Sequence, residues 1–549
     1  MTIKSSVAIL YGPRSAEYNI RMNEATIRHR NLTEIPAWQR LAAHYRDRPF
    51  DLAAMFAQDP RRAHTLSAHC GEVLLDYSKN LLDAETLRLL IELARERDLA
   101  GAIGRLFSGE PVNVSENRAA LHTALRSESP VHLDGRDITV SIKTEIDRMR
   151  TFVESIRAAK TVTDVIHIGI GGARLGAAFA GDALQAYATT PLRVHYLSTV
   201  DGGALQQLLA RLDPKYTLII VASKTFTTAE TQANAHAVRD WMAGKLGGEQ
   251  AALAKFSAVT ARPEIAEAFG IARENIFATW DWVGGRYSMC SAMALPLALQ
   301  IGMAHFDDLR AGARAMDAHF QSAALDQNLP VILALLDVWY ANFHGTTSRV
   351  VLPYLSGFKR FPAFLQQIEM ESLGKRVDVH GNPVCVNTGL VVWGESGTNG
   401  QHAFLQLLHQ GTRLIPAEFI FACRARHQYP AHHEMLAANA LAQAEALMTG
   451  KPASDPHRVY PGNRPSTTLV LPEADPYHLG LLVALYEHKT YVESVIWGIN
   501  AFDQWGVEYG KKIAATIQSE LDARAIPGTH DASTRALIDH FKTQSRRPA

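Results

Sequence analysis

The chain is poor in cysteine and carries no net charge, and each shortage excludes a class of protein. Its 549 residues include 4 cysteines, and 55 basic residues balance 55 acidic ones. None of the cysteines forms a C-x-x-C pair, and their wide spacing gives no disulfide framework. We therefore expect reduced, mostly buried thiols in an intracellular, cytoplasmic protein. The cysteines are Cys70, Cys290, Cys385 and Cys423.

The sequence also lacks a basic tail and a long apolar run. With a pI of about 7.4, it offers no electrostatic case for binding nucleic acid or an anionic membrane surface. A local cationic pocket for one small anion is still allowed. The N-terminus has no cationic segment followed by an apolar run, so we expect no signal peptide. Residues 289–303 form the most apolar region, but Pro296 and Gln300 interrupt it, which favours a buried helix over a membrane span.

What the sequence does contain is the pattern of parallel sheets covered by helices. The composition, 47% hydrophobic and 20% charged, is typical of a globular protein. Its length suggests roughly two to four domains. Several apolar segments run into a polar or glycine-rich turn and then into a helix, which predicts an α/β fold. The strands are expected at 165–168, 218–221, 390–393 and 413–421. Residues 37–105 have apolar positions three and four apart, which predicts helices.

The turn that follows the second of these strands predicts an anion site. A strand-to-helix turn directs free backbone N–H groups outward, and the helix dipole adds partial positive charge. The hydroxyls and the ammonium group that suit a phosphate monoester come from Ser223, Lys224, Thr225 and Thr228. The alternative is a capping box formed by Thr227 and Glu230, which needs no ligand. Both interpretations can hold at once.

Signatures of a dinucleotide or of a metal are weak. Residues 169–172 form a second glycine-rich turn, but it lacks the full G-x-G-x-x-G spacing and the later acidic residue. Glycine there lets a ligand approach the backbone closely, and a plain tight turn is the simpler interpretation. His432 and His433 are adjacent and would face different ways on a helix. We find no convincing metal site.

A carboxylate and a carboxamide share one helix face in residues 366–375. Glu371 follows Gln367 by four residues, and positions four apart lie on one face of a helix. A carboxylate held beside a polar group can move a proton between adjacent carbons. The alternative is a solvated helix face, and the company of the other polar segments favours the catalytic interpretation.

Three further segments carry groups that suit the same site. Arg286 follows two glycines, and it could stabilise developing negative charge or form a buried structural ion pair. His402 begins a helix, and an imidazole suits proton exchange near neutral pH. With 23 histidines in the chain, a structural role is the more common one for any of them. Gln504 and Lys511 lie two helical turns apart on one face.

Together these segments closely resemble the glucose-6-phosphate isomerase (phosphoglucose isomerase) family. Two stretches match its signatures almost in full, residues 281–288 and 498–511. Shorter matches lie at 223–228, 370–372, 397–404 and 461–465. The resemblance extends from about Leu32 to about Leu521.

The resemblance implies two sugar-isomerase (SIS) αβα sandwich domains with parallel-rich sheets, flanking N-terminal helices and a C-terminal helical arm. It also implies a homodimer whose sites combine residues of both subunits, without metal or organic cofactor. The implied boundaries are 1–32 for an N-terminal extension, 33–120 for a helical segment on the large domain, 121–292 for the smaller SIS domain, 293–512 for the larger one and 513–549 for the arm.

The resemblance further implies interconversion of glucose 6-phosphate and fructose 6-phosphate, a step of glycolysis and gluconeogenesis. Glu371 would move the proton between C2 and C1 through a cis-enediol(ate), and Arg286 would stabilise the enediolate. His402 and Lys511 would assist ring opening, with Glu230 orienting His402. The implied substrate-binding residues are Gly172, Ala173, Ser223, Lys224, Thr225, Thr228, Gly285, Gln367 and Gln504.

The chain departs from the family at the first glycine-rich turn. Members usually have Gly-Gly-Ser-Asp-Leu-Gly-Pro, whereas residues 171–177 read Gly-Gly-Ala-Arg-Leu-Gly-Ala. Ala173 removes a hydroxyl and Arg174 replaces an acidic residue, which leaves substrate affinity and epimer preference open. One rival is therefore a dual phosphoglucose/phosphomannose isomerase. A second, of a different class, is a non-catalytic SIS-type sugar-phosphate sensor, which would need the phosphate turn but no base.

Overall fold

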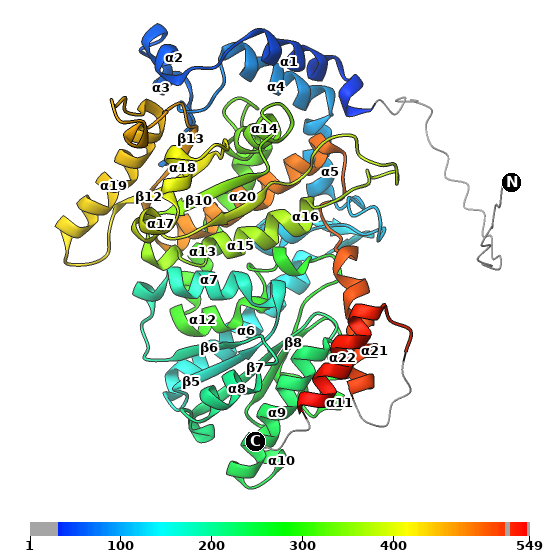
Figure 1. Ribbon diagram of the computed structural model, residues 1–549. Coiled ribbons are helices and arrows are strands. Elements are labelled where there is room, and N and C mark those ends of the chain that lie inside the picture. Colours follow the sequence, from blue (N-terminus) through cyan, green and yellow to red (C-terminus); the bar gives the residue numbers. More distant parts are fainter. Residues whose placement is uncertain (1–30, 522–527, 546–549) are drawn as a thin grey trace, which may run out of the picture.

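The computed structural model describes residues 31–521 and 528–545, and it places one large sheet in each half of the molecule (Figure 1). Apart from its last two positions, the predicted N-terminal extension lies outside these residues. A single apolar cluster extends from Leu32 to Phe502 and joins the two halves. No helix of the described chain is long and apolar enough to cross a membrane.

Within the described residues the first sheet has five strands, all parallel, in the order β6-β5-β7-β8-β9. The strands are β5 (Asp164–Ile168), β6 (Arg193–Leu197), β7 (Thr217–Ala222), β8 (Phe256–Thr260) and β9 (Ile276–Ala278). The central three are buried at every position, because helices cover both faces of the sheet. The helices of this half are α6 (Thr139–Ala159), α7 (Leu175–Ala183), α8 (Gly202–Leu209), α9 (Ala229–Leu246), α10 (Glu249–Leu253) and α11 (Pro263–Phe269).

The second sheet, over the same described ranges, has six strands in the order β1-β2-β13-β12-β10-β11. Four of them run parallel, and the β1/β2 hairpin adds antiparallel to β13. The strands are β1 (Ser67–Cys70), β2 (Val73–Asp76), β10 (Ser348–Pro353), β11 (Val391–Gly394), β12 (Ala417–Arg424) and β13 (Ser466–Glu473). Helices α17 (Gly397–Ala403), α18 (Leu405–Gln410) and α19 (Pro430–Thr449) belong to this half. Leu405 and Ala444 pack with Val350 and Phe419 of the sheet.

Three long helices form the centre of the core: α13 (Met303–Ser322), α14 (Leu329–Asn342) and α20 (Pro476–Trp497). α13 and α14 both pack along α20, which is buried over almost its whole length. Because α20 is buried on all sides, its charged residues Lys489 and Glu493 must find their partners inside the core. The other elements are α1 (Pro36–Asp47), α2 (Leu52–Gln58), α3 (Arg62–Thr65), α4 (Ala84–Glu96), α5 (Leu99–Ser108), β3 (His132–Leu133), β4 (Arg136–Asp137), α12 (Leu295–Ile301), α15 (Phe361–Leu365), α16 (Glu371–Leu373), α21 (Glu508–Leu521) and α22 (Ala532–Ser545).

The parallel strands predicted from the sequence are confirmed, with shifted ends. The strand expected at 413–421 begins at Ala417 and ends at Arg424. The prediction that residues 37–105 are helical is wrong at the β1/β2 hairpin, whose strands of four residues are too short to show a clear alternation. Pro296 does not interrupt a helix, because it lies in the first turn of α12, where a missing N–H costs nothing.

Candidate active site

Three turns that follow strands of the first sheet lie at the carboxyl edge of that sheet. The turn η3 (Gly171–Ala173) follows β5, residues 223–228 follow β7, and η7 (Gly285–Tyr287) comes after β9. β5 and β7 are hydrogen-bonded neighbours, so the first two turns start side by side. Ligands of open parallel sheets bind outside the carboxyl ends of the strands. The polar turns predicted from the sequence therefore share the edge at which a ligand is expected.

Glycine is required where two of these turns touch. A Cβ on Gly172 would lie 2.2 Å from the carbonyl carbon of Gly285, so only glycine lets the two backbones approach so closely. Gly171 has a φ of +56°, and a Cβ there would lie 3.0 Å from Nε2 of Gln367. The first turn thus packs directly against η7, which carries Arg286, and against the segment that carries Gln367.

In the turn after β7, several hydroxyl groups lie close to a residue with a left-handed backbone conformation. Phe226 has a φ of +54°, and its backbone N–H donates to Oγ of Ser223 at 3.1 Å. The Ser223 and Thr228 hydroxyls lie 3.2 Å apart. The predicted capping box is wrong: α9 begins at Ala229, its N-cap is Thr228, and no side chain caps it. Its first N–H groups therefore stay available to an anion.

Lys224 spans from this turn to the loop before η7. Its Nζ donates to the carbonyl oxygens of Asp281 at 2.8 Å and of Val283 at 3.0 Å. Burial lowers the pKa of the Lys224 ammonium group, and the Asp281 carboxylate opposes that shift. The lysine thereby connects the anion turn to the loop that leads to Arg286.

The carboxylate and carboxamide expected on one helix face do contact each other. They lie on a helix that runs from α15 through a π-helical turn, η10 (Gln366–Met370), into α16. Nε2 of Gln367 donates to Oε2 of Glu371 at 3.2 Å. Both side chains are half-buried. π-Helical turns inside α-helices are often found at functional sites.

Arg286 is buried at the junction of the two halves and contacts Glu371. Its Nη1 donates to Oε2 of Glu371 at 3.3 Å and to Oε1 of Gln504 at 3.1 Å. Nε donates to Oγ of Ser372 at 2.7 Å, and Nη2 to the carbonyl oxygens of Ala501 at 2.5 Å and Asp503 at 3.2 Å. With every nitrogen engaged, the guanidinium is held in one orientation beside the carboxylate.

Sequence reasoning assigned no role to Ser372, Lys375 and Asp503, which support Arg286 and Glu371. Ser372 accepts from Arg286 and lies 3.0 Å from the hydroxyl of Tyr287. Lys375 donates to the backbone carbonyl of Glu371 at 3.1 Å and pairs with the Asp503 carboxylate at 3.0 Å. Burial lowers the pKa of Lys375, and Asp503 opposes that shift. The only signal was the position of Ser372 and Lys375 within the polar stretch around Glu371.

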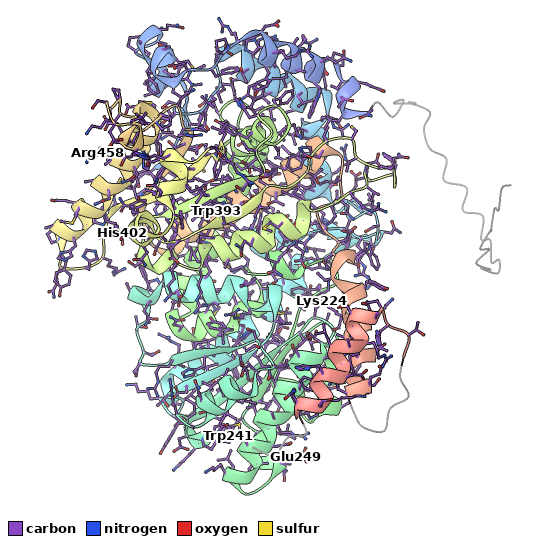
Figure 2. All side chains as sticks on the ribbon, viewed as in Figure 1. Lys224, Trp241, Glu249, Trp393, His402 and Arg458 are labelled. Atoms are coloured by element: carbon purple, nitrogen blue, oxygen red, sulfur yellow. The ribbon has the colours of Figure 1, made fainter. Side chains whose placement is uncertain are left out.

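His402, Lys511 and Glu230 are not brought to this pair within one chain. His402 is exposed on α17, and Figure 2 shows it on the opposite side of the molecule from Lys224. Nζ of Lys511 donates to Glu508 at 2.8 Å, and 56% of its side chain is exposed. In the described part of the chain, no hydrogen bond joins either residue to Glu371, or Glu230 to His402. Their roles stay predictions.

The altered residues lie at the end of the first turn, where α7 begins. Ala173 packs on the apolar core, and Arg174 is half-buried. Burial, with the charge of Arg174 added, lowers the pKa of His167 to about 3. Burial also lowers the pKa of Arg174 itself, and the neighbouring Arg360 adds to that shift. Across the described residues, Arg174 donates no hydrogen bond to the anion turn or to Glu371.

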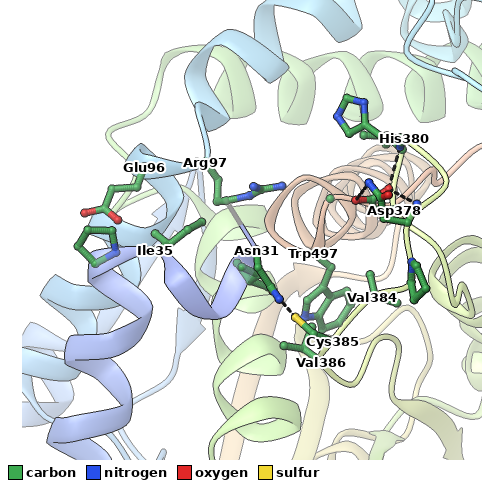
Figure 3. Close-up of a pocket in the computed structure, with 16 residues that line it drawn as sticks. Asn31, Ile35, Glu96, Arg97, Asp378, His380, Val384, Cys385, Val386 and Trp497 are labelled. Atoms are coloured by element: carbon green, nitrogen blue, oxygen red, sulfur yellow. Dashed lines mark hydrogen bonds between the residues drawn. The ribbon is translucent and has the colours of Figure 1, made fainter. Parts of the chain in front are cut away.

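A separate cavity of about 1180 Å³ opens elsewhere on the molecule (Figure 3). Asn31, Arg97, Cys385 and Trp497 are among its lining residues, and none of the predicted site residues is. Charged and hydrogen-bonding groups converge instead at the carboxyl edge of the first sheet. A base, a fixed cation and an anion-binding turn together suit proton transfer on a phosphorylated substrate.

Known proteins resemble this chain over nearly all its length. A family model described as phosphoglucose isomerase matches residues 76–538. The chain is 46% identical over 541 residues to the glucose-6-phosphate isomerase of Methylococcus capsulatus, covering 93% of this chain and 99% of that protein. It is 45% identical over 535 residues to that of Deinococcus radiodurans, with the same coverage. A crystal structure of a glucose-6-phosphate isomerase from Chlamydia trachomatis matches with a TM-score of 0.84 at 31% identity, covering 94% of this chain and 100% of that one.

Proposed function

The chain belongs to the phosphoglucose isomerase family, and from this premise we propose how its own residues carry out the reaction. The reaction is the interconversion of glucose 6-phosphate and fructose 6-phosphate, an aldose–ketose isomerisation. The observation that carries the proposal is the position of Glu371, whose Oε2 accepts from both Gln367 and Arg286. A carboxylate fixed by two donors, one of them a buried cation, suits a base that acts on a carbon acid.

In the proposed mechanism Glu371 takes the proton from C2 of the open-chain aldose. The electron pair of the C–H bond forms the C1=C2 bond of a cis-enediolate, and negative charge develops on the oxygen at C1. Arg286 stabilises that charge, which exists mainly near the transition state. A proton then moves from the oxygen at C2 to the oxygen at C1, and Glu371 returns its proton to C1. No oxidant or reductant is needed.

The turn of residues 223–228 is proposed to hold the phosphate, far from the reacting carbons. The Ser223 and Thr228 hydroxyls and the first N–H groups of α9 are its donors. Binding a non-reacting group places C1 and C2 beside Glu371 and lowers the entropic cost of the reaction. Lys224 gives up no existing contact in this scheme, because it can keep its carbonyl partners while its charge favours the anion.

Ring opening is proposed to need His402 and Lys511, with His402 supplied by a second copy of the chain in a homodimer. In support, His402 is exposed and makes no hydrogen bond to Glu371 within the described residues. Large apolar side chains are exposed on α19, α21 and α22: Met435 is 67% exposed, Tyr509 73% and Leu537 66%. Such side chains favour a covered surface.

We further propose that the protein works in the cytoplasm. The four cysteines, of which Cys385 and Cys423 are exposed, form no disulfide. Thiols that remain reduced at a protein surface are typical of a reducing compartment. The substrates are sugar phosphates, whose charge keeps them on one side of a membrane.

Isomerisation in D₂O tests the proton-transfer mechanism. If Glu371 shuttles the proton through an enediolate, part of the glucose 6-phosphate formed from fructose 6-phosphate should carry deuterium at C2. The ¹H NMR signal of C2–H should weaken accordingly. A hydride shift from C1 to C2 would leave that position fully protonated, and full protonation together with an unimpaired Glu371→Gln variant would remove Glu371 from the base role.

Mixing two inactive variants tests the shared site. Glu371→Gln and His402→Ala subunits, unfolded and refolded together, should form hybrid dimers that have one intact site. Random pairing predicts recovery of about a quarter of the wild-type activity, because half of the dimers are hybrids with one active site of two. Each variant refolded alone is the control. No recovery in the mixture would place both residues in the same chain's site.

A second candidate, the dual phosphoglucose/phosphomannose isomerase, is favoured only by Ala173 and Arg174. The missing hydroxyl changes the wall of the turn that packs against Gln367 and η7. A looser grip near C2 would let the proton return to the other face of that carbon. Formation of mannose 6-phosphate from fructose 6-phosphate, read in the same samples, distinguishes the two candidates.

A further inference from the structure

A cluster of six charged side chains is buried beneath the helix that carries Glu371. Its members come from α14, β10, η10, β12 and α20, and each is at most 4% exposed. They are Asp337, Arg349, Glu369, Glu418, Lys489 and Glu493. Burying an ion costs several kcal/mol unless partners compensate it closely. A cluster of this size is therefore expected to fix the elements that contribute to it.

Glu369 receives the two cations of the cluster. Nη2 of Arg349 donates to both of its carboxylate oxygens at 2.7 Å, and Nζ of Lys489 donates to its Oε2 at 3.0 Å. Lys489 also donates to Asp337 at 2.6 Å and to Glu493 at 3.0 Å. Asp337, Glu369 and Glu493 lie close enough together to hold a metal ion, but the ammonium group of Lys489 bonds to all three carboxylates. The cluster is therefore a set of ion pairs and not a metal site.

Protonation brings the cluster close to neutrality. Four carboxyl groups face two cations, which would leave two negative charges unpaired. Burial raises the pKa of Glu418 to about 7, and burial also raises the pKa of Glu493 well above its ordinary value. Proton uptake, which burial favours at these two carboxyl groups, reduces that excess of negative charge. The ion pairs on Glu369 are then compensated rather than competing with excess charge.

Glu369 is the cluster's connection to the reacting residues. It lies in the π-helical turn η10, two residues after Gln367 and two before Glu371. Glu369 is 2% exposed and points into the core, while Gln367 and Glu371 are half-buried and contact each other on the other side of the turn. A π-helical turn is less stable than the α-helix around it, so something must hold it in place.

We propose that Glu369 is a positioning residue for the isomerisation: its ion pairs with Arg349 and Lys489 fix the π-helical turn and so hold Gln367 and Glu371 at the reacting carbons. The inference rests on the proposed function, because it concerns the base of that reaction. Glu369 does not touch the substrate and acts through the backbone of η10. A displacement of the base by about 1 Å is enough to lower a rate about 100-fold.

The test compares Glu369→Gln with Asp337→Asn in the full-length protein. Both changes replace a buried carboxylate bound to Lys489 by an amide, but Asp337 lies on α14 and has no bond to η10. We expect both variants to lose thermal stability. We expect only Glu369→Gln to lose kcat, by about 10- to 100-fold, with KM changed less than threefold. Equal kcat values for the two folded variants, or a rise confined to KM, would overturn the proposal.

The fraction of label that is transferred does not depend on how much of the protein is folded, so it separates a positioning role from a loss of stability. Glucose 6-phosphate deuterated at C2 is converted to fructose 6-phosphate, and the deuterium retained at C1 is measured by NMR. A base that is no longer fixed gives the enediolate more time to exchange with water, so Glu369→Gln should retain less label than wild type. Retention equal to that of Asp337→Asn would overturn the proposal.

If Glu369→Gln does not fold, Glu369→Asp tests the same proposal. It keeps the charge that Arg349 and Lys489 require and shortens the side chain by one methylene, so we expect a folded protein with reduced kcat and reduced label retention. Wild-type values for both would overturn the proposal. The two hypotheses fail separately: a wild-type protein that does not isomerise refutes the proposed function, whereas active wild type with unaffected Glu369 variants refutes only the positioning role.

Discussion

Replacing Glu371 by Gln removes the proposed base while keeping its shape. Oε2 of Glu371 accepts bonds of 3.2 Å from Gln367 and 3.3 Å from Arg286, and the amide oxygen of a glutamine can accept both. The local geometry should therefore survive, and the loss should fall on proton transfer. General acid–base catalysis contributes about 10²- to 10⁴-fold. Because Arg286 and the phosphate turn remain, we expect kcat to fall on the order of 10³-fold, or about 4 kcal/mol.

The assay follows initial rates in both directions and the binding of a six-carbon sugar-acid phosphate that cannot isomerise. We expect kcat to fall while KM and the affinity for the analogue stay close to wild type, because the change removes an interaction of the transition state. Glu154→Gln, an exposed glutamate on α6, is the matched control and should behave as wild type. A folded Glu371→Gln protein with kcat within tenfold of wild type would refute the base role.

Three further changes test other parts of the structure. Gly172→Ala places a Cβ 2.2 Å from the carbonyl carbon of Gly285, and overpacking of this kind costs about 1–3 kcal/mol, so both the melting temperature and kcat should fall; an unchanged melting temperature would contradict the close approach. Ala173→Ser restores a hydroxyl to the first turn and should lower KM for fructose 6-phosphate, whereas an unchanged or higher KM would mean that other groups already supply that contact. Glu418→Gln should remove a pH-dependent part of the stability. Burial raises the pKa of Glu418 from 4.5 to about 7, so its stabilising contribution is complete below pH 4.5 and is lost as the pH rises through 7. Between those values the wild-type free energy of unfolding in urea should fall more steeply than the variant's, by at most about 1.4 kcal/mol per pH unit, and parallel slopes would contradict the assignment.

The sequence located the central residues because their signals are local. The spacing of Gln367 and Glu371 predicts a shared face, and the structure has them in contact. The π-helical form of that turn was out of reach, because a four-residue spacing suits an α-helix equally well. Arg286 was left between a catalytic and a structural role by the sequence, and its five hydrogen-bond partners come from segments far away along the chain, which no local pattern reveals.

Other features depend on long-range pairing. The β1/β2 hairpin joins a sheet whose nearest strand, β13, begins at Ser466, so neither its partner nor its register can be read near residue 70. The buried partners of Glu369 are Arg349 on β10 and Lys489 on α20, and in the sequence that glutamate looks like one polar residue among several. The predicted capping box is wrong by one residue: Phe226 has a positive φ, α9 begins at Ala229, and Thr228 rather than Thr227 precedes the helix.

We expect the protein to isomerise its substrate without a metal ion and through Glu371. The most direct test is the conversion of fructose 6-phosphate by purified protein treated with a chelator, with glucose 6-phosphate and mannose 6-phosphate both quantified. We expect wild type to form glucose 6-phosphate rapidly and Glu371→Gln to form about a thousandth as much in the same time. Wild-type protein that forms no glucose 6-phosphate, or a variant as fast as wild type, would contradict the claim.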